Sequence, residues 1–215
     1  MLIRAGSDCC AAVKKMMVVR EPSRAQSSVV DFVYMGKYKG RVGWAAWRRR
    51  MTAHSSMEVA RSGEAVYVRI NGPGNMKLCP TLQDFARRMV KEGYTKFIVN
   101  LKDCSTMDST FMGTLVELAS LAKPGAESLL IINAKDHCEG LLEGLGLDNV
   151  LQIKRGYTEL PDIELEPLPE YAVKQAERIR LIKQAHENLV EIDERNREKF
   201  GPFLRQLTKE MENMP

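Results

Sequence analysis

The chain lacks the features that mark membrane, disulfide-rich and metal-binding proteins. It has no run of about 20 apolar residues, so no membrane-spanning helix is predicted. The cysteines are odd in number and form no CxxC pair, which argues against a disulfide framework and a zinc site. They are Cys9, Cys10, Cys79, Cys104 and Cys138. We therefore expect a reducing, cytoplasmic location and no metal, with Cys104 and Cys138 buried as small hydrophobic side chains.

Sequence signatures of catalysis are also missing. The chain contains no GxSxG nucleophile elbow and no Walker loop. Its three histidines, His54, His137 and His186, lie in unlike sequence contexts, and His137 is expected in the turn that starts a helix. A triad of Ser109, Asp108 and His137 would lack the elbow that exposes a catalytic serine. We therefore expect a protein that is not an enzyme and that needs no cofactor.

Charge is divided unevenly along the 215 residues. Residues 1–56 hold 11 Lys and Arg but 3 Asp and Glu, whereas residues 57–215 hold 21 basic and 25 acidic residues. The first segment shows no sustained helical or strand period. We expect it to be a disordered basic segment, or a stretch upstream of the true start, which would then be Met57. A transit peptide, and a nucleic-acid patch of Trp44, Trp47 and the arginines at 48–50, remain alternatives.

From Met57 onward the hydrophobic pattern alternates between strands and helices. Strands are expected at residues 65–71, 96–101, 128–133 and 150–153. Helices are expected at residues 81–92, with Thr81 as the cap, at 108–122 and at 137–145, and turns at 71–75 and 102–107. This order predicts an α/β fold in which helices pack on a mostly parallel or mixed sheet of four to five strands.

The composition changes again after this α/β segment. Residues 158–169 form an acidic, proline-containing linker, and residues 170–215 are rich in strong helix formers. The expected helix at 170–199 has a thin apolar stripe and ends at Gly201-Pro202. It fails the coiled-coil pattern at His186, Asp193 and Asn196. This helical extension either lies on its own domain, partly solvated, or serves as an arm for self-association or for a partner.

A short motif in this pattern resembles a known family. The residues Asp108-Ser109-Thr110-Phe111-Met112-Gly113 follow a hydrophobic strand and a turn, as does the motif Asp-Ser-[Ser/Thr]-Gly-[Leu/Val]-Gly of the STAS domain. The strand at 129–132 and the segment 145–150 extend the resemblance over residues 57–157. Within this family the chain is similar to the anti-sigma factor antagonists, which implies a STAS-like fold and a cytoplasmic regulator.

The resemblance also implies a partner and a chemical switch. In these antagonists an anti-sigma factor that is an ATP-binding serine kinase phosphorylates the serine after the aspartate. The unmodified antagonist holds the kinase and frees the sigma factor. By position, Ser109 is then the phosphoacceptor and Thr110 a secondary one.

The residues themselves are compatible with such a switch. Asp108 is a favourable helix N-cap, which places Ser109 in the first helical turn, where free amides and the helix dipole tolerate a phosphate. A partner packed over Ser109 would instead meet a new dianion beside a carboxylate. We expect partner contacts from the helix start and, more weakly, from the turn before the first helix. These residues are Asp108, Ser109, Thr110, Phe111, Met112, Asn71 and Asn75.

One residue departs from the family motif. Phe111 stands where the family has glycine, so it either packs inward against the sheet or anchors an interface. Together with the helical extension, it favours a second interpretation. In that alternative the STAS-like domain is a docking or scaffold module of a signalling or transporter complex, without a phosphorylation cycle.

Overall fold

The structure, a computed structural model, describes residues 54–121 and 128–212. The expectations for residues 1–53, including Trp44 and Trp47, lie outside the described residues. The strands are β1 Ser56–Ser62, β2 Ala65–Gly74, β3 Lys96–Asn100, β4 Cys104–Met107, β5 Leu129–Ile132, β6 Gln152–Lys154 and β7 Glu166–Leu168. The helices are α3 Cys79–Lys91, α4 Ser109–Leu121, α5 Asp136–Glu143, α6 Gln175–Ile192 and α7 Glu194–Glu212, with a short 3-10 turn at Leu147–Asn149.

The sheet is mixed and mostly parallel. Its strand order is β6-β5-β3-β2-β1-β7, and β4 pairs with the end of β2. The pairs β2/β3, β2/β4, β3/β5 and β5/β6 are parallel, whereas β1 pairs antiparallel with β2 and β7. The α/β class and the mixed sheet are confirmed, but the described residues form seven strands where four or five were expected.

One additional strand, β4, and the last residues of β2 lie where turns were predicted. The end of β2 and the whole of β4 pair with each other, through Gly72 with Cys104 and Gly74 with Met107. The register shifts between Gly72 and Pro73, at the residue that has no backbone N–H to donate. Gly72 has a φ of +76°, and a Cβ there would lie 2.2 Å from the His54 carbonyl oxygen. Glycine and proline therefore mark an irregular strand end at this place, and the turn predictions were wrong.

The other two additional strands come from segments with weak sequence patterns. β1 forms a hairpin with β2, in which Ser62 pairs with Ala65 across a two-residue loop. β7 lies inside the expected acidic linker and pairs with β1, Met57 opposite Leu168. The chain therefore returns to the edge of the sheet before it enters the C-terminal helices.

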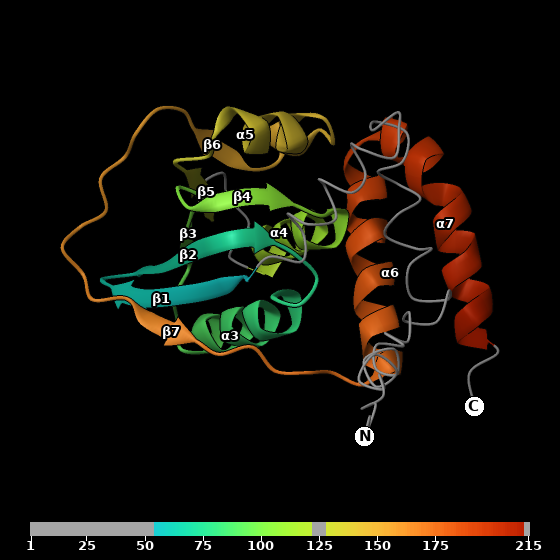
Figure 1. The fold of residues 1–215 in the computed structure, drawn as a ribbon, viewed down its shortest axis with the longest axis horizontal. Helices are drawn as coiled ribbons and strands as arrows, with labels where there is room; N and C mark the ends of the chain where they lie inside the picture. The colour runs from blue at the N-terminus through green and yellow to red at the C-terminus, as the bar shows by residue number, and fades with distance from the viewer. Residues whose placement is uncertain (1–53, 122–127, 213–215) are drawn as a thin grey trace, which may run out of the picture.

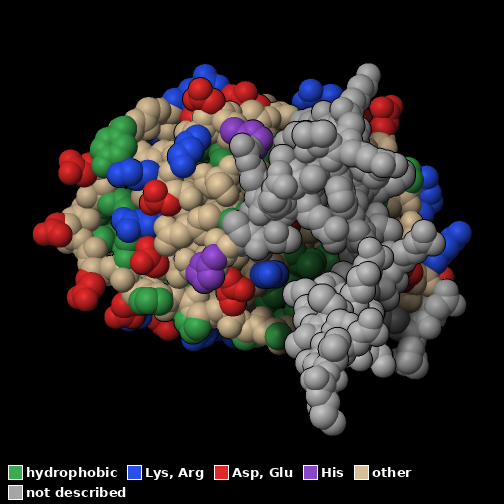
Figure 2. Space-filling view, in the orientation of Figure 1, with side chains coloured by type: hydrophobic (Ala, Val, Ile, Leu, Met, Phe, Trp, Pro, Cys, Tyr) green, Lys and Arg blue, Asp and Glu red, His purple; other side chains and the backbone are tan. Residues whose placement is uncertain are grey.

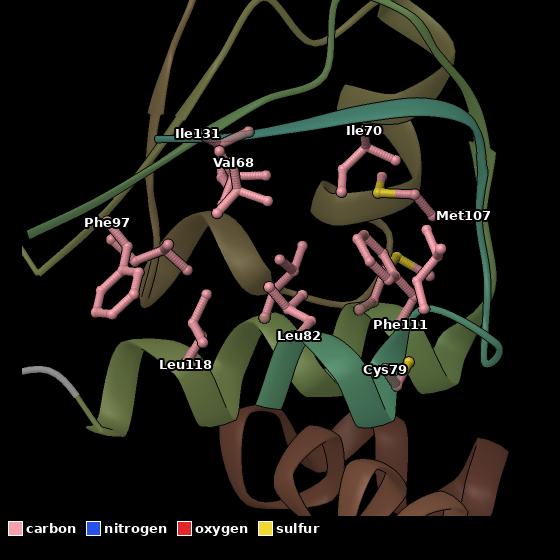
Figure 3. Close-up of a cluster of buried hydrophobic side chains, with 14 of the residues drawn as sticks. Val68, Ile70, Cys79, Leu82, Phe97, Met107, Phe111, Leu118 and Ile131 are labelled. Carbon is pink, nitrogen blue, oxygen red and sulfur yellow. The ribbon is translucent and has the colours of Figure 1, made fainter. Parts of the chain in front are cut away.

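The main core lies between the sheet and the helices α3 and α4. Figure 3 shows side chains of the sheet pointing toward side chains of these helices; its labels include Val68, Ile70, Phe97, Ile131, Leu82, Phe111 and Leu118, all of which are buried. The start of α3 differs from the prediction. Its N-cap is Leu78 and not Thr81, and the buried Thr81 hydroxyl has no hydrogen-bond partner.

The helices α6 and α7 stand side by side across the end of the sheet at which β2 and β4 terminate (Figure 1). We call residues 175–212 the C-terminal hairpin. Its two helices separate at Asp193, which is extended, and the Asp193 carboxylate accepts a hydrogen bond from the Arg195 amide at 2.9 Å and so caps α7. The predicted break at Gly201-Pro202 was wrong, because Pro202 lies inside α7.

The surface shown in Figure 2 carries acidic and basic side chains close to one another over the part formed by the sheet and its helices. Within residues 54–121 and 128–212, no helix has the length and apolar composition needed to cross a membrane.

Candidate functional site

The first turn of α4 is fixed by Asp108. Its Oδ1 accepts a hydrogen bond from the Phe111 amide at 2.8 Å, three residues later, which is the geometry of a helix N-cap. Its Oδ2 accepts a second hydrogen bond from the Met76 amide at 2.9 Å. The Asp108 amide donates to the Gly74 carbonyl at 2.9 Å. Asp108 therefore caps α4, as predicted, and also ties the helix start to the loop that follows β2.

The Asp108 carboxyl group is buried, and its ionisation is correspondingly disfavoured. Burial raises its pKa to about 6, although hydrogen bonds from the Phe111 and Met76 amides act in the opposite direction. At neutral pH Asp108 is therefore a buried carboxylate, and the Met76 and Phe111 backbone amides donate hydrogen bonds to it.

Ser109 is the first residue of α4, and the C-terminal hairpin covers it. Its side chain is 4% exposed, and its Oγ lies 2.9 Å from Nε2 of His186 on α6. The other ring nitrogen of His186 lies 2.8 Å from the Ile182 carbonyl oxygen. Because a carbonyl oxygen only accepts, Nδ1 carries the hydrogen, and Nε2 accepts a hydrogen bond from the Ser109 hydroxyl.

His186 lies in an apolar environment formed by both helices of the hairpin. It is 3% exposed, and its ring makes edge contacts with Phe200 at 4.9 Å and Phe203 at 4.8 Å between ring centroids. Burial lowers its pKa to about 4. A neutral imidazole that accepts from a serine hydroxyl is also the arrangement of a nucleophile and its base. Here, however, the low pKa makes a weak base, and the burial of both groups leaves no access for a substrate.

The contributions of His186 and Asp108 to folding stability change with pH in opposite directions. The neutral form of His186 is favoured by folding, so its contribution is complete above pH 6.5 and is lost as the pH falls toward 4. The protonated form of Asp108 is favoured by folding, so its contribution is complete below 3.8 and is lost as the pH rises through about 6.

Replacing His186 by Gln should therefore change the pH dependence of stability. Between pH 7 and pH 4.5 the wild-type protein should lose about 2 kcal/mol relative to His186→Gln, because only its histidine resists protonation in the folded state. Urea unfolding at both pH values measures this difference. His137→Gln, at an exposed position, is the matched control for replacing a histidine by glutamine. Equal pH dependence of His186→Gln and wild type would contradict the assignment.

A second contact between α4 and α6 lies one turn beyond Ser109. A Cβ at Gly113 would lie 2.1 Å from the Ala185 carbonyl oxygen and 2.8 Å from the Ala185 Cα, so only glycine fits there. Asn188 also donates to the Gly113 carbonyl at 3.3 Å. The backbone of α6 therefore approaches α4 at the second glycine position of the motif.

The structure buries the five motif residues predicted to contact a partner: Asp108, Ser109, Thr110, Phe111 and Met112. Of the two orientations considered for Phe111, the inward one is observed. Its ring points toward Met107 and the sheet (Figure 3), and a Cβ at Gly74 would lie 2.8 Å from it. Gly74 on β2 thus provides the space for the large side chain that replaces the family's glycine.

The two weaker candidates lie in different surroundings. Asn75 is buried in the loop that Asp108 holds; its Oδ1 accepts from the Lys77 amide at 3.0 Å, and its Nδ2 lies 3.4 Å from the Ser55 hydroxyl. Asn71 belongs to β2 and donates to Glu58 on β1 at 3.1 Å. Only Asn75 is therefore adjacent to the start of α4.

His186 is the residue that the sequence interpretation missed. It was read as a position where a coiled-coil pattern fails, yet it continues the apolar stripe of α6 one turn after Ile182. A second signal lay in α4 itself, whose 13 residues include one charged side chain, Glu117. A helix that is apolar on nearly all sides is covered on more than one side, so a covering element was to be expected.

Other reactive groups lie apart from the helix start. Cys104 and Cys138 are free and buried, as expected, and their mutual hydrogen bond lowers the pKa of Cys104 and raises that of Cys138. His137 lies in the first turn of α5, with Nε2 3.3 Å from the Thr106 hydroxyl. In the part of the chain that the structure describes, no three His, Cys, Asp or Glu side chains are grouped as metal ligands.

Comparisons with known proteins agree with the motif. The family model of the STAS domain matches residues 56–160, which confirms the resemblance seen in the sequence, and we call this segment the STAS domain. The chain is also similar to the anti-sigma-B factor antagonist of Staphylococcus aureus, with 25% identity over 101 residues that cover 47% of this chain and 94% of that protein.

Solved structures of low sequence identity were also matched. The unphosphorylated anti-sigma factor antagonist SpoIIAA is 16% identical, with 46% of this chain and 88% of that chain covered and a TM-score of 0.42. An anti-sigma factor antagonist from Mycobacterium paratuberculosis is 17% identical, with 50% of this chain and 88% of that chain covered and a TM-score of 0.42.

Proposed function

We propose that the protein is a non-enzymatic, cytoplasmic regulator of the anti-sigma factor antagonist type. It binds a partner protein, an ATP-binding serine kinase that acts as an anti-sigma factor, through the start of α4. Phosphorylation of Ser109 switches this binding off, and Thr110 is a secondary acceptor. The observation that carries the proposal is the position of Ser109, directly after the Asp108 cap in the first turn of α4 of a STAS domain.

The chemistry of the helix start supports this role. A phosphate on Ser109 would lie at the amide-rich, positive end of α4, which favours anions. For a partner packed over the same turn, the phosphate would add about −1.5 to −2 charges beside the Asp108 carboxylate. The similarity to a protein named anti-sigma-B factor antagonist favours this class of regulator. The free cysteines Cys79, Cys104 and Cys138 fit a reducing compartment.

A second candidate function is favoured by the burial of the acceptor. The Ser109 hydroxyl is covered by α6 and donates its hydrogen to His186, so in this arrangement a kinase could not reach it. In the second candidate the STAS domain is a docking module without a phosphorylation cycle, and the Ser109–His186 hydrogen bond is a structural contact.

Intact-mass measurement and site mapping of the protein isolated from its own cells separate the two functions. The antagonist function predicts a single phosphate on Ser109 under some growth or stress condition. The variant Ser109→Ala, expressed in the same cells, should lose it, and a phosphate that then appears on Thr110 would identify the secondary acceptor. A chain that stays unmodified in every condition would contradict the phosphorylation switch and favour the docking module.

A further inference from the structure

The C-terminal hairpin packs as one unit against the STAS domain. Its two helices share an apolar cluster formed by Ile182, Phe203 and Leu207, against which Met76 of the STAS domain also packs. The edge contacts of His186 with Phe200 and Phe203 also join α6 to α7. The contacts between α6 and α7 join residues within the hairpin, so the two helices can stay together if they leave the STAS domain.

The surface that the hairpin covers is the start of α4. His186 contacts the Ser109 hydroxyl, and Ala185 and Asn188 contact Gly113. At the far end, Asn196 and Lys199 donate to the carbonyls of Leu145 and Gly144 at 2.9 and 2.8 Å. The hairpin thus occupies the residues that the proposed function assigns to a partner.

This internal interface is apolar at its centre and polar at its edge. Leu181, Leu189 and Phe200 of the hairpin belong to the main core of the STAS domain. Beside them, between α6 and the helices α3 and α4, lies a cavity of about 240 Å³. Its lining includes Gln83, Arg87, Glu117, Glu177, Arg180 and Gln184. An apolar centre with a polar, charged rim is typical of interfaces between separately folded parts.

A short tether joins the two parts. After β7 ends at Leu168, residues 169–174 lead to α6 without helix or strand. Six extended residues span about 20 Å, enough for the hairpin to swing clear of α4 with β7 still paired to β1, once the tether's own hydrogen bonds are released. These join Glu170 to Ser55 and Tyr171 to Pro80 and Asp84. The tether also keeps the hairpin close to its docking surface, which favours return.

We infer that the C-terminal hairpin is an internal competitor that masks the partner-binding surface of the STAS domain. A partner that docks on the start of α4 must displace α6, and the docked hairpin excludes this partner, the proposed kinase, from Ser109. In the closed state the α6 backbone packs against Gly113, and in the open state the partner packs against the same residue. The identity of the masked surface as a partner site rests on the proposed function; the opening of the hairpin does not.

A glycine substitution tests the mask in the full chain. Gly113→Ala places a methyl group against the Ala185 backbone and so should push α6 away, while alanine itself favours the α4 helix. We expect amide hydrogen exchange of residues 175–212 to accelerate at least tenfold, while β3 and β5 keep their wild-type protection. Gly140→Ala is the matched control, because nothing lies within 4 Å of a Cβ at this position of α5.

A second variant acts from the hairpin side and leaves the STAS domain unchanged. Ala185→Glu puts a charged side chain at a buried position of α6 that faces Gly113, and it should produce the same acceleration. Gln175→Glu adds the same charge at an exposed position of α6, away from the cavity beside α3 and α4, and should have no effect. Agreement between Gly113→Ala and Ala185→Glu separates undocking of the hairpin from damage to the core.

Access to position 109 is measured directly by thiol labelling. In a Ser109→Cys background, the modification of residue 109 by N-ethylmaleimide is followed by peptide mass spectrometry. We expect labelling to be at least tenfold faster when Gly113→Ala is added, and unchanged when Gly140→Ala is added. The inference would be wrong if residue 109 were labelled at the same rate in all three proteins. It would also be wrong if amide exchange of the hairpin stayed at the wild-type rate in both Gly113→Ala and Ala185→Glu.

These outcomes are independent of the test of the proposed function. If the hairpin opens as expected but Ser109 is never phosphorylated in cells, the mask stands and the phosphorylation switch fails. If Ser109 carries phosphate but residue 109 is labelled equally in every background, the switch stands and the mask is wrong.

Discussion

Phe111→Ala is expected to lower the free energy of unfolding by about 3–5 kcal/mol, since the ring is fully buried and its removal leaves a cavity between α4 and the sheet. Gly74 cannot fill the cavity because it has no side chain, and Met107, which borders the same space, belongs to a paired strand. Urea unfolding monitored by circular dichroism measures the loss. An effect of this size would mean that the main role of Phe111 is to pack in the core of this STAS domain.

The control for Phe111 is an aromatic residue on the surface. Tyr157 is 72% exposed, and its ring contacts Lys102. Tyr157→Ala should change the free energy of unfolding by no more than about 0.5–1 kcal/mol. If Phe111→Ala lowered the free energy of unfolding as little as Tyr157→Ala, the Phe111 ring would have to face outward in solution. The alternative that it anchors an interface would then be favoured.

Asp108→Ala is expected to be the second large effect, a loss of about 2–5 kcal/mol. It removes the acceptor of two backbone amides, those of Met76 and Phe111, and leaves both without a partner in a buried region. The start of α4 and the loop after β2 should loosen together. Urea unfolding gives the total loss, and faster amide exchange at both Met76 and Phe111 would identify its source.

Asp108→Asn is the matched control for this prediction. Asparagine is also a good helix N-cap, and its single amide oxygen can still accept from the Phe111 amide. It faces the Met76 amide with a donor instead, so a loss of about 1–2 kcal/mol is expected. Because both variants remove the charge, an effect of Ala no larger than that of Asn would show that the lost hydrogen bonds to the Met76 and Phe111 amides are not the source of the instability.

The sequence was sufficient for the parts of the fold that have strong patterns. The runs around Val68, Val99 and Ile131 predicted the central strands, and the spacing of apolar residues predicted the helices on the sheet. β1, β4 and β7 were missed because their sequences contain Ser, Cys, Glu or Pro, and pairing with β2 or β1 decides that such residues form a strand. Pairing between distant segments leaves little trace in a local pattern.

The candidate site was predictable in its chemistry but not in its accessibility. The positions of Asp108 and Ser109 followed from local helix capping, which a sequence motif encodes directly. The cover over Ser109 depends on His186 of α6, which lies 77 residues later in the chain, and on a glycine whose role is set by the Ala185 backbone. Long-range packing of this kind could have been suspected only from the nearly uncharged composition of α4.

The short outer strands of the sheet have a consequence for assembly. The sheet ends with β7 on one side and β6 on the other; each has three residues, with Pro167 in β7 and Lys154 in β6. Brief edges with a proline or a lysine discourage the addition of a strand from another molecule. Oligomers built by continuing this sheet from one copy to the next, and the aggregation that follows the same route, are therefore disfavoured at both ends.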